Sequence, residues 1–301
     1  MRKSLRSWHA ASSYDLHRSA LSPWGLLVGI LSVLVAAPAA ADHQPLWEVH
    51  LGAGAARIPY YRGSSQDHQY LLPVPVFIYR GERIRAGDGG IEGILLRSDR
   101  AKLDISLAAG LPARSDEAGP RTGMPRLSAT FELGPSLELN AWRNSETGSA
   151  LWAIFPLRAA FAFDDLEARG VGGVFAPYLE WGQMLGDWRA MLTFGPIFGT
   201  RDYHGYFYDV EPQYATNTRP AYDAPGGYSG TRVGLGLRQR TGKKWVRFYV
   251  RYDYLDGARF EDSSLVQQDH YIAAGIVMTW QVWQSSKPTE HMDSALDPHQ
   301  R

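Results

Sequence analysis

Hydrophobic and polar residues alternate with a period of two along most of the chain after residue 45. Between Trp245 and Leu255, one set of alternate positions is Val246, Phe248, Val250, Tyr252 and Tyr254, and the other set carries arginine and aspartate. The ranges 101–108, 126–142, 229–240 and 269–283 repeat this pattern. Such alternation is typical of β-strands with one apolar and one polar face. It predicts an all-β chain whose strands separate two different environments.

The turn signals between these runs predict twelve strands. They cover residues 46–56, 70–80, 83–87, 90–97, 101–108, 126–142, 149–163, 171–182, 188–199, 229–240, 245–255 and 269–283. Connections after even-numbered strands are short, whereas those after odd-numbered strands are mostly long: 57–69, 109–125, 164–170, 200–228 and 256–268. Outer-membrane barrels have short periplasmic turns and longer outer loops. We therefore expect an antiparallel transmembrane β-barrel of about twelve strands.

A water-soluble sandwich of two sheets would show the same alternation. Two further observations favour the membrane. The polar faces of the strands carry charges that a dry sandwich core could not bury. Tryptophans also lie at or near predicted strand ends, where barrels carry aromatic girdles: Trp47, Trp142, Trp181, Trp188, Trp245 and Trp283.

The first 41 residues have the features of a secretory signal peptide. A basic leader precedes the apolar stretch from Trp24 to Val35, and alanines 39–41 precede Asp42. The alternative is a membrane anchor, but a spanning helix needs about 20 apolar residues. We predict cleavage after Ala41, a barrel over residues 42–283 and a polar C-terminal tail over residues 284–301. The tail lacks an apolar period and is predicted to be disordered.

Charge and cysteine content narrow the class of protein. Without the leader, 27 basic residues stand against 30 acidic ones, which gives no sign of nucleic-acid binding. The chain contains no cysteine, so an exported domain of this length has to be stable without disulfides. A large core or a closed sheet would meet that requirement.

The segment IPYYRGSSQDHQYLLPVPVFIYR, residues 58–80, resembles the P-x-Y-x-G-S … P-x-P … Y-R signature of the MipA/OmpV family, the MltA-interacting and outer-membrane V proteins. The matching positions include Pro59, Tyr60, Gly63, Ser64, Pro73, Pro75, Tyr79 and Arg80. Further matches follow at Gly134-Pro135-x-Leu137 and Tyr206-Phe207. There are two departures from the family pattern. One extra residue lies between Phe207 and Val210, and the chain continues past Trp283, where such barrels tend to end on an aromatic residue.

The resemblance implies an outer-membrane barrel of a Gram-negative cell envelope, in contact with outer-membrane lipid. Some members of the family are thought to scaffold murein synthases and lytic transglycosylases, and others to act as channels or adhesins. We therefore expect a structural or scaffold protein with those periplasmic enzymes as partners. A narrow channel is the alternative. The resemblance does not choose between these roles.

Two prolines in the resembling segment carry a structural prediction of their own. Proline lacks the N–H group that a ladder needs and is usually confined to strand edges, strand starts or bulges. Pro73 and Pro75 share one parity, so both missing donors point toward the same neighbouring strand. The predicted third strand, 83–87, is the shortest. We hypothesise a weak seam between the second and third strands.

No residues stand out as catalytic. Enzymatic barrels need a serine, a histidine and a carboxylate together, or paired carboxylates. His50 is the histidine that lies well inside a predicted strand, away from its ends, on the same face as Glu48. Four loop carboxylates could gather calcium, but ordinary solvation explains them better: Asp202, Asp209, Glu211 and Asp223. We predict no catalytic residue, no cofactor and no metal site.

The charged residues at the polar alternate positions of the strands form the most specific group of candidate functional residues in the sequence. In a barrel they would face the lumen, and arginines dominate the last third of the chain. The candidates are Arg189, Arg232, Arg238, Arg247, Arg251, Glu132, Glu138 and Asp253. Two interpretations stay open. Arginine–carboxylate pairs could seal the lumen, or the lumen could be a narrow pore for small anions or polar solutes.

Overall fold

The computed structural model describes residues 44–87, 90–112, 119–164 and 167–289. The chain divides into two units, residues 1–42 and 43–301, and everything described below belongs to the second. The predicted signal peptide and the tail beyond Thr289 lie outside the described residues. Within the described ranges, no helix is both long enough and apolar enough to cross a membrane.

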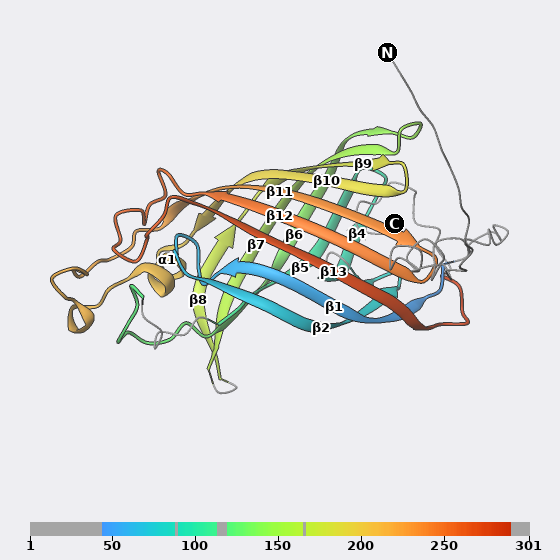
Figure 1. Ribbon diagram of the computed structural model, residues 1–301. Helices are drawn as coiled ribbons and strands as arrows, with labels where there is room; N and C mark the ends of the chain where they lie inside the picture. The colour runs from blue at the N-terminus through green and yellow to red at the C-terminus, as the bar shows by residue number, and fades with distance from the viewer. Residues whose placement is uncertain (1–43, 88–89, 113–118, 165–166, 290–301) are drawn as a thin grey trace, which may run out of the picture. The chain divides into compact units, whose positions relative to one another are not determined.

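The second unit is a closed antiparallel β-barrel (Figure 1). Pairing of β13 with β1, in register at Ala55 and Ile276, joins the last strand to the first. The strands are β1 (Trp47–Pro59), β2 (Asp67–Arg80), β3 (Ile84–Gly87), β4 (Gly90–Arg97), β5 (Ala101–Gly110), β6 (Ala129–Asn144), β7 (Ser149–Asp164), β8 (Glu167–Phe175), β9 (Tyr178–Leu185), β10 (Trp188–Gly199), β11 (Gly227–Thr241), β12 (Lys244–Tyr254) and β13 (His270–Gln284).

Strands β8 and β9 occupy a single position in the wall, because both pair with β7 on one side and β10 on the other. Ala176 and Pro177 separate them. Pro177 has no N–H to donate to the ladder, so the strand predicted over residues 171–182 is interrupted there. The described wall therefore has twelve strand positions, which confirms the predicted twelve-stranded barrel.

The long loops gather at one end of the barrel, together with helix α1 (Arg201–Tyr208) and the short 3₁₀ helix η1 (Pro212–Tyr214) (Figure 1). The first residues of β1 and the last residues of β13 lie at the opposite end of the barrel, with the short turns. One connection differs from expectation. Residues 164–170 were expected to form a long loop, but the β7–β8 hairpin continues as far as the pair Asp164↔Glu167.

The two faces of the wall match the alternation in the sequence. Large apolar side chains such as Leu192, Leu235 and Phe248 are exposed on the outside. The intervening positions carry buried charges, among them Asp104 and Asp253. An apolar outer band of this kind is what a membrane-spanning barrel requires.

The described pairing between β2 and β3 is short, as the hypothesised weak seam requires. Strand β2 pairs with β1 along its whole length, from Asp67 to Tyr79. Within the described residues, β3 pairs with β2 at two positions, Tyr79↔Ala86 and Arg80↔Arg85. Pro73 and Pro75 lie in the part of β2 that has one paired side.

The chain remains ordered against the barrel for a few residues past Trp283. The amide of Ser285 donates to the Trp47 carbonyl at 2.9 Å, and the amide of Leu46 donates to the Lys287 carbonyl at 2.9 Å. The amide of Thr289 reaches the Gln44 carbonyl at 2.8 Å. The first residues of the predicted tail are therefore hydrogen-bonded to the start of the barrel. Residues 290–301 lie outside the described part.

Candidate functional site

The first half of the family-like motif forms the turn between β1 and β2. Gly63 has a φ of 86°, a left-handed conformation that glycine adopts without strain. Its carbonyl accepts hydrogen bonds from the amides of Gln267 and Gln268, at 2.8 and 3.2 Å. Ser64 is buried beside it, and the ring of Tyr60 stacks on His68 at 3.9 Å between centroids. This half of the motif fastens the turn to the loop before β13.

The second half of the motif lies at the opposite end of the barrel. Arg80 donates from Nη1 to the Pro45 carbonyl at 2.9 Å, and its Nη2 lies 2.7 Å from Glu48 Oε1. The Arg80 carbonyl accepts a hydrogen bond from Thr289 Oγ1 at 3.3 Å. Arg80 thereby joins the segment before β1, the interior of the barrel and the segment after β13. We call this assembly the periplasmic rim.

The outer loops pack into a hydrophobic cluster, which we call the cap. Its buried members are Tyr61, Leu127, Tyr208, Ala224, Leu255, Ala258, Phe260 and Tyr271. The rings of Tyr208 and Phe260 stack at 3.7 Å. The hydroxyl of Tyr61 donates to the Leu265 carbonyl at 2.8 Å, and burial raises the pKa of Tyr61 to about 12. The long loops thus form a packed lid with its own apolar core.

Helix α1 supports the cap from the loop between β10 and β11. Thr200 is its N-cap residue and accepts a hydrogen bond from the Tyr203 amide, which satisfies one of the free donors of the first turn. The hydroxyl of Tyr203 reaches down to Glu132 Oε1 at 3.1 Å. A predicted lumen carboxylate on β6 is therefore bonded to the cap.

Asp253 is the point where the cap meets the charged interior. Its side chain is fully buried, and its Oδ1 lies 3.2 Å from Arg62 Nε and 3.0 Å from Arg232 Nε. Its Oδ2 lies 2.9 Å from Arg251 Nε. Burial acts to lower the pKa of Arg62, but Tyr271 and Asp253 outweigh it and raise that pKa above its ordinary value. The sequence singled out Asp253, Arg232 and Arg251 and missed Arg62, which lies in a loop.

A second charged cluster lies on the facing side of the barrel, around Lys102. Its Nζ is 3.0 Å from Glu92 Oε2, 3.1 Å from Asp104 Oδ2 and 3.2 Å from Glu138 Oε2. The three carboxylates have oxygens within 4.8 Å of one another, a spacing that could hold a metal ion. The Lys102 ammonium already occupies the centre and supplies the positive charge. Glu138 was a predicted lumen residue.

The other predicted lumen residues lie on the same interior face. Arg189 is buried on β10, and Arg238 is directly opposite Arg247 in the β11–β12 ladder. The guanidinium of Arg247 lies over the Trp245 ring, 4.6 Å from its centroid. A cation over an indole face is a favourable contact.

The histidine inside a predicted strand also has a partner. His50 Nε2 lies 2.9 Å from Glu48 Oε2, and both side chains are buried. The Trp245 ring meets the imidazole edge-on at 5.3 Å. The pair belongs to the interior packing beside Arg80.

One histidine–serine pair was not foreseen. His204 Nε2 lies 2.5 Å from Ser229 Oγ, and its Nδ1 lies 2.6 Å from the Pro225 carbonyl oxygen. Such distances suit a nucleophile and its base. Both side chains are buried, however, and the Phe260 ring covers the imidazole at 4.8 Å. In this arrangement the pair ties α1 to β11 and offers no access to a substrate.

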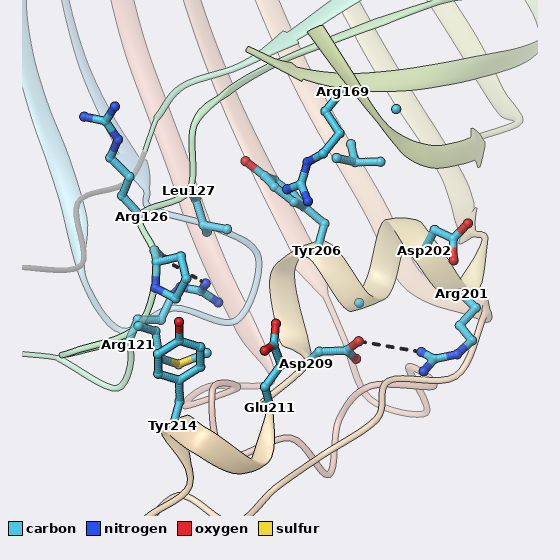
Figure 2. Close-up of a pocket in the computed structure, with 15 residues that line it drawn as sticks. Arg121, Arg126, Leu127, Arg169, Arg201, Asp202, Tyr206, Asp209, Glu211 and Tyr214 are labelled. Atoms are coloured by element: carbon cyan, nitrogen blue, oxygen red, sulfur yellow. Dashed lines mark hydrogen bonds and ion pairs between the residues drawn. The ribbon is translucent and has the colours of Figure 1, made fainter. Parts of the chain in front are cut away.

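Figure 2 shows a pocket of about 500 Å³ on the outer side of the cap, between α1, the loop before β6 and β8. Arg121 donates to the carbonyls of Phe207 and Pro125, and burial lowers its pKa. Arg169 lies over the ring of Tyr206 at 5.9 Å. Of the four loop carboxylates, Asp202, Asp209 and Glu211 line this pocket, and Arg201 lies 3.7 Å from Asp209 and 2.7 Å from Asp223.

The family model described as "MltA-interacting protein MipA" matches residues 51–282. The chain belongs to the MipA family. The match runs from β1 to β13 and so covers the barrel, the cap and the interior charges. The closed barrel and its apolar outer band agree with the outer-membrane barrel that the resemblance to this family implied. No curated protein matches the sequence.

Several solved barrels are similar to this MipA-family chain at low identity. A bacterial polysaccharide outer-membrane secretin is 8% identical with a TM-score of 0.40, covering 80% of this chain and 100% of the other. The translocator domain of the autotransporter NalP from Neisseria meningitidis is 12% identical with a TM-score of 0.37, covering 79% and 89%. Outer membrane phospholipase A from Escherichia coli is 11% identical with a TM-score of 0.31, covering 82% and 94%.

Proposed function

We propose that this protein is a scaffold of the outer membrane that holds a lytic transglycosylase, and with it a murein synthase, at its periplasmic rim. The observation that carries the proposal is the packed cap. Four outer loops bury apolar residues in it, so the long loops pack over this end of the barrel instead of forming an open vestibule. The description of the family as MltA-interacting names the class of partner.

The periplasmic rim supplies a surface for such a partner. Arg80 holds the segments on either side of the β1–β13 closure together, so the rim is preorganised for binding. The exposed turns at the same end of the barrel carry charges of both signs, including Asp99, Glu146 and Lys243. A rim of this kind suits a partner with a mixed-charge surface, because charge complementarity favours encounter and register.

The scaffold role is tested by binding. The barrel is placed in nanodiscs and titrated with a purified MltA-type lytic transglycosylase. We expect saturable binding that weakens when Asp99→Ala and Glu146→Ala, in two short turns at this end of the barrel, are combined. A matched outer-loop change, Asp223→Ala, should leave the affinity unchanged. If the wild-type barrel shows no binding, or if both variants lose affinity equally, the proposal fails.

A narrow channel is the second candidate, and the interior arginines favour it. The side chains of Arg232, Arg240 and Arg251 are 36%, 38% and 32% exposed although they lie on the interior face. The interior is therefore incompletely packed toward both ends of the lumen. Planar-bilayer recording of the wild type and of the combined Arg247→Gln and Arg251→Gln changes would decide. If the protein is a channel, the wild type should conduct ions with a preference for anions, and that preference should fall in the variant. Absence of conductance in both proteins would exclude a channel.

A further inference from the structure

In the described part of the chain, two strands have edges without a ladder partner in the outer half of the wall. Strand β3 is too short to follow β2, so residues 67–78 of β2 have no β3 partner in the described chain. On the other side, β4 pairs with β5 from Lys102 to Ile105, and residues 106–110 of β5 pair with β6 alone. We call the space between these two edges the window.

The window has a floor and a roof. The short β3–β4 hairpin forms the floor, where Ala86 pairs with Ile91. Above it, the described part of the loop before β6 lies at the top of β2. A Cβ atom placed on Gly119 would come within 2.2 Å of the Gln66 side chain, so the loop lies directly against that residue. The window is therefore enclosed above and below.

The prolines explain why another strand does not fill this edge. In an antiparallel pair, residues of one parity bond to one neighbour and residues of the other parity bond to the opposite neighbour. Pro73 and Pro75 lie opposite Ala53 and Leu51 in an unbroken ladder, so they occupy the parity that points away from β1. Tyr79, of the same parity, is paired with β3. The edge thus lacks two donors that an added strand would need.

The lumen side of the window is apolar. Register places Leu72, Val74 and Val76 on the same face as Gly54, Gly52 and His50, and His50 is buried in the interior. A Cβ on Gly54 would meet Val74 Cγ2 at 3.1 Å, which confirms the shared face. Leu72 is nevertheless 51% exposed, while its outward neighbour Leu71 is 80% exposed. Apolar surface therefore continues from the outside of β2 to its inside across the open edge.

Backbone groups cannot face hydrocarbon unpaired, and irregular or open edges at membrane depth occur where they line a water-filled cavity. The one-sided edge of β2 carries the lumen-facing Leu72, which is half exposed, and so meets that condition. We propose that the window is a lateral opening through which acyl chains of bilayer lipids reach the apolar lumen surface formed by Leu72, Val74 and Val76. This opening is independent of the scaffold role, because the periplasmic rim is at the other end of the barrel.

Site-specific fluorescence tests the window, since the chain has no native cysteine. Leu72→Cys is labelled with bimane and placed in nanodiscs whose lipids carry bromine on the acyl chains, and iodide is added separately from water. We expect quenching by both reagents. Leu71→Cys, on the outer face, should respond mainly to bromolipid. Tyr249→Cys, on the lumen face of β12 away from the window, should respond to iodide alone.

Each other result overturns the proposal. Quenching of the Leu72→Cys label by iodide alone would mean that the window is closed to lipid chains. Quenching by bromolipid alone would mean that residue 72 faces the bilayer and that the register differs. If Leu72→Cys does not show the heat-modifiable migration of a folded barrel, Val74→Cys probes the same face with the same expected outcomes.

Discussion

Arg62 and Asp253 form an ion pair, with 3.2 Å between Arg62 Nε and Asp253 Oδ1, although 191 positions separate them in the chain. Arg62 lies in the turn after β1, and Asp253 lies near the outer end of β12. Two further arginines, Arg232 and Arg251, contact the same buried carboxylate. Asp253 is therefore the anion that holds the cap to the wall.

Asp253→Asn should destabilise the barrel markedly. The change keeps the shape of the side chain but removes the charge that three arginines share. Leaving buried charges without a partner costs about 3–5 kcal/mol. The free energy of unfolding, measured with urea in detergent or lipid, checks this value. Arg57→Gln is the control. Arg57 pairs with Asp67 in the β1–β2 hairpin that also carries Arg62, but Arg57 is exposed and should contribute little.

Acidification should loosen the cap. Burial lowers the pKa of His204 below its ordinary value of 6.5, and the nearby Arg62 adds to this, while the hydrogen bond to the Pro225 carbonyl opposes it. The unfolded cap therefore binds a proton that the folded cap does not. Stability from this residue is complete above about pH 6.5 and falls as the pH drops toward the lowered pKa.

Protease cleavage within residues 200–226 measures this response. Cleavage should be slow at pH 7.5 and accelerate below pH 6, while the rest of the barrel stays intact. His204→Gln should flatten the pH dependence, whereas His270→Gln, which changes an exposed histidine, should preserve it. A cleavage rate that is independent of pH in the wild type would show that His204 does not control the cap.

The strand from Lys244 to Tyr254 shows why the wall could be predicted from sequence. Lipid and lumen impose opposite polarity on alternate positions, so the period-two pattern of Phe248, Val250 and Tyr252 reports the two environments directly. The same pattern put Arg247 and Asp253 on the interior face, where the structure has them. The one-sided edge of β2 could also be predicted from sequence, because proline lacks a backbone N–H group wherever it lies.

The cap could not be predicted in this way. Its contacts join Tyr61, Tyr208 and Phe260 from three loops, and loop sequences carry no period that would reveal their partners. Arg62 escaped notice for the same reason. Glu92 lies on the short strand β4, and its ion pair with Lys102 depends on the register between strands. The break between β8 and β9 at Pro177 was not predicted either, because a single sequence locates strand boundaries poorly.

Leu235→Lys should prevent or weaken folding into lipid. Leu235 is 44% exposed on the outer face near the middle of β11, and a lysine at the bilayer midplane costs about 2–4 kcal/mol. Arg238→Gln, three residues along the same strand on the interior face, should cost less. Folding yields and unfolding free energies in lipid vesicles compare the two. Equal tolerance at both positions would mean that the apolar face is not in the membrane.

Truncation should separate the ordered segment after β13 from the rest of the tail. A chain ending at Thr289 keeps all the described contacts and should unfold like the full-length protein. A chain ending at Trp283 loses three backbone hydrogen bonds, to Gln44, Leu46 and Trp47, and the contact of Thr289 with Arg80. At about 0.5–1.5 kcal/mol for each bond, we expect a loss of about 2–4 kcal/mol while heat-modifiable migration is retained.

These two truncations also locate the boundary of the fold. If the chain ending at Trp283 is as stable as the full-length protein, the segment from Ser285 to Thr289 rests passively on the rim. If the chain ending at Thr289 is already destabilised, residues 290–301 contribute to the fold. Lys287→Ala is a further control, because it leaves the backbone bond to Leu46 in place and should preserve stability. A loss confined to the Trp283 truncation would show that backbone pairing at the β1–β13 closure, and not the tail as a whole, stabilises the barrel.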